Sequence, residues 1–258
     1  MKQQIYITDQ EKENCQRVVA AFHDFFQQTD ILVLDTGKYG FALLKYFNGD
    51  GFDCIETYIS SNALFDALWQ EWLKEKLIAL CIHTPLIDLE YEKMFDGLSA
   101  KQQNEILEAK ENFQFKIKNV HTNPDVTAPK TLSVSDPEKS RCETVANLFR
   151  KDLEKNDIIL KEAGKYGFIM LEYLKPKSNF DCAYIFTDCQ TMFHALLNEW
   201  YDCLITDLML EKQVTNIDMD DFYDALPEEE KIQLQNRKQQ FVKDALKKAD
   251  FITAPQML

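Results

Sequence analysis

The pattern of hydrophobic and polar positions predicts that the chain begins with a helix. Thr8 is followed three residues later by Glu11, the spacing of a capping box, in which each side chain bonds the other residue's backbone N–H. Beyond it, apolar side chains recur three and four residues apart, as on the buried face of a helix, at Cys15, Val18, Val19, Phe22 and Phe26. We therefore expect an amphipathic helix that begins at Thr8.

Three strands are expected next, joined by tight turns. Apolar runs predict them at 31–34, at 39–47 and from Phe52 to about Ile59. Gly37, in the sequence GKYGF, lies between the first two runs, where a tight turn favours a residue that tolerates positive φ. Gly40 leaves the second strand without a side chain at one point, which indicates close approach of another backbone or of an aromatic ring.

The sequence GKYGF occurs a second time, at 164–168, so Gly164 is predicted to lie in the same kind of turn as Gly37. The similarity extends along both halves of the chain, through segments that keep the same order: TDQEKENC (8–15) with SDPEKSRC (135–142), FDALWQEW (65–72) with FHALLNEW (193–200), and VTAPKTL (126–132) with ITAPQML (252–258). So many matches in one order predict a tandem duplication.

Each half is expected to end in helices. Apolar positions at i, i+3 and i+7 predict a second helix, at Phe65, Leu68 and Trp72 and again at Phe193, Leu196 and Trp200. In the first half a short helical turn near Met94 precedes a last helix, which begins at Ser99. In the second half the corresponding turn lies near Phe222 and the last helix begins at Pro227. The predicted fold class is therefore α+β: a tandem duplication of an α-β-β-β-α-α unit, with a three-stranded antiparallel meander and helices in each lobe.

The predicted domains follow from the repeat. Residues 1–126 form the first lobe, residues 127–134 a linker, and residues 135–258 the second lobe. Each lobe has the ordinary size of a single domain. The joint contains proline, serine and threonine and has no helical period, which is typical of a linker.

The middle strand of the meander is apolar on both faces, whereas a sheet with one face in water alternates apolar with polar residues. One face carries Tyr39, Phe41 and Leu43, and the other Ala42, Leu44 and Tyr46. Helices can cover one face. The sister repeat, the remaining helices or a partner chain would have to cover the other.

The charge of the chain limits its partners. The 258 residues carry 43 acidic and 29 basic side chains, a net charge of −14. Residues 1–130 have 20 acidic and 13 basic side chains and residues 131–258 have 23 and 16, so each half has a net charge of −7. Such a chain repels phosphate backbones, so we expect no direct nucleic-acid binding.

Cysteine usage and the N-terminal sequence predict a cytoplasmic protein. The seven cysteines are an odd number without a CxxC pair, which favours free, mostly buried thiols over a disulfide framework. The first residues, MKQQIYITDQEKENC, have neither the apolar core of a signal peptide nor the composition of a transit peptide. No apolar run approaches the length of about 18 residues that spans a bilayer.

The repeat also helps to identify catalytic or metal sites, because a site that is essential to each lobe should appear in both lobes. None of the four histidines has a histidine counterpart, and no nucleophile elbow, P-loop or dinucleotide motif occurs. Asp53 and Asp181 recur within FDC, but one carboxylate without a partner is no mechanism. We expect no metal site and no cofactor.

The leading hypothesis is a non-catalytic, acidic, two-lobed interaction protein that binds another protein. Inhibitors or immunity-type proteins and nucleic-acid mimics that bind a basic protein fall within this class. A small-molecule site between the lobes is the alternative. A hydrolase or transferase using Asp53, Asp181 or a cysteine is a third. A homodimer is left open.

The repeated GKYGF segments provide the candidate binding residues: Lys38, Tyr39, Phe41, Lys165, Tyr166 and Phe168. If exposed, these aromatic side chains would form a patch rimmed by lysines, as binding surfaces often do. If the tyrosines are inaccessible to solvent, they belong to the core instead.

Overall fold

The computed structural model describes residues 6–47, 51–81, 91–119, 134–175 and 177–253. The chain divides into two compact units, which we describe separately: unit 1 is Met1–Lys130 with Lys177–Phe180, and unit 2 is Thr131–Pro176 with Asp181–Leu258. The predicted linker at 127–134 lies outside the described residues apart from residue 134.

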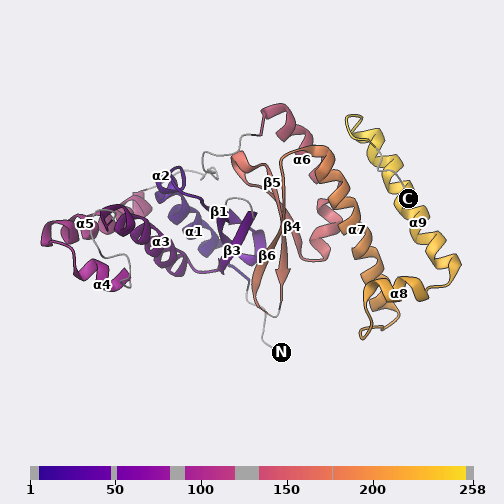
Figure 1. The fold of residues 1–258 in the computed structure, drawn as a ribbon, viewed down its shortest axis with the longest axis horizontal. Helices are drawn as coiled ribbons and strands as arrows, with labels where there is room; N and C mark the ends of the chain where they lie inside the picture. Colours follow the sequence, from indigo (N-terminus) through magenta and orange to yellow (C-terminus); the bar gives the residue numbers. More distant parts are fainter. Residues whose placement is uncertain (1–5, 48–50, 82–90, 120–133, 176, 254–258) are drawn as a thin grey trace. The chain divides into compact units, whose positions relative to one another are not determined.

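Both halves of the chain combine helices with a small antiparallel sheet, as the α+β prediction expects (Figure 1). The first half contains α1 (Asp9–Ala21), α2 (His23–Phe26), β1 (Ile31–Asp35), β2 (Phe41–Phe47), β3 (Gly51–Tyr58), α3 (Ser61–Cys81), α4 (Tyr91–Asp96) and α5 (Ala100–Asn119). The second half contains α6 (Asp136–Lys155), β4 (Ile158–Glu162), β5 (Phe168–Leu174), β6 (Asn179–Phe186), α7 (Cys189–Glu211), α8 (Met219–Ala225) and α9 (Glu228–Lys248).

The strands form the predicted meanders. Their orders are β1-β2-β3 and β4-β5-β6, so each strand pairs with its neighbour in sequence. The first hairpin places Asp35 opposite Phe41, and its counterpart places Glu162 opposite Phe168. A register shift between Leu43 and Leu44 interrupts the pairing of β2 with β3.

The first helix of each half buries the stripe that its sequence predicts. Cys15, Val18, Val19, Phe22 and Phe26 are all buried in unit 1, although the helix is interrupted at Phe22 and resumes as α2. In unit 2 the stripe runs along the continuous helix α6, and its members are almost inaccessible to solvent: Cys142, Val145, Ala146, Phe149 and Leu153.

Each sheet has helices packed on one face, and its side chains are also buried on the other. Val33, Phe41 and Leu43 join α1, α3 and α5 in the core of unit 1. Phe168 and Met170 do the same with α6, α7 and α9 in unit 2. The alternate side chains of the first hairpin are no more exposed, with at most 1% of their surface accessible: Leu32, Leu34, Ala42 and Leu44.

The turn between the first two strands differs from the prediction in one respect. Gly37 lies in a hairpin connection with φ of 73°, as expected, but Gly37–Tyr39 forms a 3-10 turn (η1) and the return strand begins only at Phe41. Tyr39 is therefore not a strand residue. The cause is Gly40, whose φ of 98° turns the chain before the strand begins.

Gly40 and Gly167 confirm the prediction of a close backbone approach. A Cβ at Gly40 would clash with the carbonyl oxygen of Tyr58, and one at Gly167 with that of Phe186. Their positive φ values also lie in a region that side-chain-bearing residues rarely occupy. The repeated glycines thus let the end of the third strand pass against the turn.

No helix in the described part of the chain is both long enough and apolar enough to cross a membrane.

Candidate functional site

The aromatic side chains of the predicted patch lie in the interior. Tyr39 is 5% exposed and Tyr166 is 0% exposed. Phe41 and Phe168 belong to the helix-facing cores of their units, with 2% and 1% exposure. Of the two alternatives, the burial of these rings favours the core: Tyr39 and Tyr166 lie in the 3-10 turns, Phe41 and Phe168 begin β2 and β5, and all four belong to the fold.

Of the two lysines in these segments, the structure places Lys38 at the surface beside aromatic rings. Its ammonium lies 4.8 Å from the ring centre of Tyr39 and 5.5 Å from that of Tyr6. These contacts are cation–π interactions, which hold the lysine stem over the turn. The side chain of Lys165 lies outside the described residues. Lys38 therefore shields Tyr39 and does not rim an open patch.

The repeated aspartates lie on the outer strands of their sheets. Asp53 is exposed on β3, directly opposite Lys45 of β2. Asp181 is exposed on β6. An exposed carboxylate opposite a lysine on a sheet edge has the surroundings of a surface charge, and opposite charges across a strand pair stabilise the sheet.

The buried thiols are poor nucleophiles. Burial raises the pKa of Cys15, Cys142 and Cys203 to about 12, and burial together with the nearby Glu138 raises that of Cys189 to about 11. A thiol with such a pKa is almost entirely protonated near neutral pH, whereas catalytic cysteines have a lowered pKa. These four cysteines therefore serve packing.

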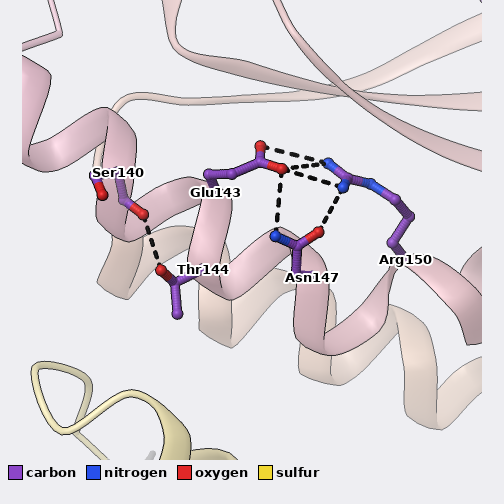
Figure 2. Close-up of polar contacts among 5 residues, drawn as sticks. All are labelled: Ser140, Glu143, Thr144, Asn147 and Arg150. Atoms are coloured by element: carbon purple, nitrogen blue, oxygen red, sulfur yellow. Dashed lines mark hydrogen bonds and ion pairs between the residues drawn. The ribbon is translucent and has the colours of Figure 1, made fainter.

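A network of polar side chains lies on the surface of α6, as Figure 2 shows. The guanidinium of Arg150 donates hydrogen bonds to both carboxylate oxygens of Glu143, at 3.1 and 3.4 Å, and to the side-chain oxygen of Asn147. Thr144 donates to the backbone oxygen of Ser140. All five residues lie on one helix, and such surface pairs contribute little stability. The network has the composition of a solvated helix face.

No group of three or more histidine, cysteine, aspartate or glutamate side chains among the described residues is placed to hold a metal ion.

A groove lies between α7 and α9 in unit 2. We call it the α7–α9 groove. It has a volume of about 570 Å³ and combines acidic with apolar side chains and one arginine, Arg237. Its principal residues are Leu204, Asp207, Leu208, Glu211, Glu229, Glu230 and Leu234.

One carboxylate in this groove is only partly satisfied. Lys212 donates a hydrogen bond of 2.9 Å to Oε1 of Glu230. The second oxygen, Oε2, is buried and has no hydrogen-bond partner within the described part of the chain. A buried oxygen without a donor is unfavourable, and because Oε2 is inaccessible to solvent it offers no contact to a ligand.

Nothing in the sequence pattern predicted this groove. Asp207 and Glu211 are four residues apart and therefore share a helix face, while Glu229 and Glu230 suit a helix N-terminus. Both signals are local. That the two pairs line the same groove depends on how α9 packs against α7.

No family model, no curated protein and no solved structure matches this chain.

Proposed function

We propose that this chain is a tandem duplication and works as a non-catalytic, acidic interaction protein that binds a basic partner protein through the α7–α9 groove. The support for duplication is the matched sequence order together with the same succession of strands and principal helices in both halves. The support for the partner is the groove itself, above all the acidic and apolar side chains that line it.

The lining of the groove defines the chemistry of the partner. Its four carboxylates outnumber the single guanidinium of Arg237, so lysine or arginine side chains of a partner would be attracted to it. Its leucines would pack against the apolar side of the same segment. The best fit is an amphipathic segment with a basic edge. The net charge of −14 adds long-range attraction for a basic protein and repulsion for nucleic acid.

Charge reversal in the groove tests this proposal. The full chain would serve as bait in a cell extract, before and after nuclease treatment, beside the variant Asp207→Lys/Glu229→Lys. A control with the same change of charge is Glu108→Lys/Glu111→Lys, which alters exposed residues of α5 in unit 1. Captured proteins would then be purified and titrated one at a time.

The expected result is a basic protein that binds the wild type and the control but not the groove variant, with affinity that falls as salt rises. Capture that depends on nucleic acid, or a partner that binds the groove variant as tightly as the wild type, would contradict the proposal.

A further inference from the structure

In unit 2 one glutamine holds the chain that follows α9 against the start of α7. After α9 the chain makes a turn in which the backbone N–H of Ile252 donates to the oxygen of Ala249 at 3.2 Å. Both backbone groups of the next residue, Thr253, then pair with the side chain of Gln190. The N–H of Thr253 donates to Oε1 at 2.8 Å, and its oxygen accepts from Nε2 at 3.0 Å. We call this contact the Gln190–Thr253 pair.

His194 lies one helical turn beyond Gln190 on α7 and contacts the same pair. Its Nε2 is 2.6 Å from Nε2 of Gln190 and 3.4 Å from the backbone oxygen of Thr253. The backbone of Thr253 fixes the orientation of the carboxamide, because its N–H needs an acceptor and its oxygen needs a donor. The group that Gln190 turns toward His194 is therefore the amide nitrogen, which can only donate.

This arrangement requires a neutral imidazole. To accept from the amide, Nε2 of His194 must carry no proton, so the proton of the neutral ring is on Nδ1. An imidazolium has a proton on both nitrogens and would place two donors against each other at 2.6 Å. Gln190 would then have to rotate its carboxamide or move away. Either change takes the acceptor from the N–H of Thr253.

The charged groups around this contact have both signs. Residues 190–198 of α7 contain no acidic side chain, lysine or arginine. The elements that meet here contribute five charged groups: Glu138, Arg141, Lys247, Lys248 and Asp250. Arg141 lies 5.7 Å from the ring centre of Phe251 and pairs with Glu138 at 3.3 Å, and the other three are exposed. Among the described residues no carboxylate bonds to His194, so none stabilises an imidazolium there directly.

We propose that His194 is a pH-dependent switch that holds Thr253 to α7 while its imidazole is neutral and releases Thr253 when the imidazole takes up a second proton. Histidine is the side chain whose charge ordinarily changes between about pH 5 and 8. Only the released form accommodates the extra proton, so the pair is present at higher pH and is lost as pH falls through the titration of the ring.

The change is confined to the contact with α7. Ile252 is 3% exposed and belongs to the core of unit 2, so the turn itself stays in place when Thr253 is released. The switch involves the first turns of α7, whereas the α7–α9 groove is lined by α7 only from Leu204 onward. The inference therefore does not depend on the function proposed above.

NMR spectra of the full chain between about pH 8 and pH 5 test the switch. The backbone amide of Thr253 reports the pair, and a long-range proton–nitrogen spectrum reports which ring nitrogen of His194 carries the proton. The wild type is compared with Gln190→Ala and with His194→Gln, which keeps an acceptor but takes up no proton. His23→Gln is the matched control, because it removes an exposed histidine of α2 in unit 1.

At about pH 8 the wild type should have the imidazole proton of His194 on Nδ1 and an ordered Thr253. Toward about pH 5 the amide of Thr253 should shift and lose order with the same midpoint as the ring signals, while Ile252 stays ordered. His194→Gln should keep Thr253 ordered throughout the range. Gln190→Ala should release it throughout, and His23→Gln should behave as the wild type.

The comparison with His194→Gln separates the histidine from nearby carboxylates. Burial raises the pKa of Glu199 and of Asp202, further along α7, toward the range of the experiment. A backbone hydrogen bond lowers the pKa of Glu138, which moves it away from that range. His194→Gln leaves all three carboxylates in place, so a change caused by them would persist in this variant.

Three results would overturn the proposal. The first is an amide signal of Thr253 that does not change between about pH 8 and pH 5 in the wild type. The second is a change that persists in His194→Gln, and the third is a neutral His194 with its proton on Nε2. The first and third are measured on the wild type, so they do not depend on the folding of any variant.

Discussion

The carboxylate of Glu11 accepts a hydrogen bond of 2.8 Å from the backbone N–H of Ser61, the first residue of α3. Glu138 makes the equivalent bond in unit 2, where it accepts from the N–H of Cys189, the first residue of α7. In each unit the glutamate near the start of one helix thus caps the start of another, some fifty residues later in the chain. This hydrogen bond joins the N-terminal ends of the two helices and provides a partner for a backbone N–H of the later helix, which has none within that helix.

The cap makes the stability of unit 2 depend on pH. The hydrogen bond from Cys189 lowers the pKa of Glu138 below the ordinary value of 4.5, so the contribution is present above that value and is lost as pH falls through the lowered pKa. Glu138→Ala should cost about 0.5–2 kcal/mol of unfolding free energy at neutral pH. The difference from wild type should vanish in acid, as measured by denaturant unfolding across pH. Glu154→Ala, at an exposed position of the same helix, should show no such dependence.

Two glycines of one turn should differ in their tolerance of a side chain. Gly40→Ala combines a positive φ with a clash against the Tyr58 carbonyl, so we expect a loss of about 2 kcal/mol or more. At Gly37 the φ of 73° is also positive, but no atom lies near the added Cβ. Gly37→Ala should therefore cost only about 1–2 kcal/mol. Urea unfolding of both variants checks the order, and equal losses would contradict the role of the close approach.

The tyrosines of the repeated segments should affect stability. Because Tyr39 and Tyr166 are buried, replacing either by alanine should remove about 3–5 kcal/mol, the usual cost for a large buried side chain. Tyr184, which is 56% exposed on β6, is the matched control and should change stability by less than about 0.5 kcal/mol. Thermal unfolding distinguishes the outcomes. If the double variant Tyr39→Ala/Tyr166→Ala had the melting temperature of the wild type, the two rings would not stabilise the fold.

Thiol titration should find seven free cysteines. We expect all seven to react in the unfolded chain without reductant, since none of the five with described side chains forms a disulfide bond. In the folded protein, Cys54 is partly exposed and should react first. Cys15, Cys142 and Cys203 should react slowly, because burial raises their pKa to about 12. Fewer than seven thiols after unfolding would indicate disulfides.

Local sequence patterns determined most of the secondary structure. Helical spacing predicted the buried stripe of α1, because a helix brings residues three and four apart to one face. Ser99 and Gln102 form the reciprocal capping box expected from their spacing. The positive φ of Gly37 was predictable because it depends on the turn between two adjacent strands.

The tertiary structure decided which of those elements contact one another and through which side chains. Thr8 accepts from the N–H of Glu11 as the capping box predicts, but the carboxylate of Glu11 turns to Ser61. Ser135 makes no side-chain bond to the described helix α6 that follows it. Short-range spacing carries no information about a partner fifty residues away, so the bond predicted from Glu11 back to the N–H of Thr8 was wrong.

The candidate sites show the same limit. GKYGF identified a turn from sequence, but whether Tyr39 and Tyr166 faced solvent depended on the fold around them, which buries both. Conversely, Asp207 and Glu229 give only helix-surface signals in sequence, and they line the same groove because α7 packs beside α9. A site made by two helices exists only after those helices have packed, because its shape and charge belong to neither helix alone.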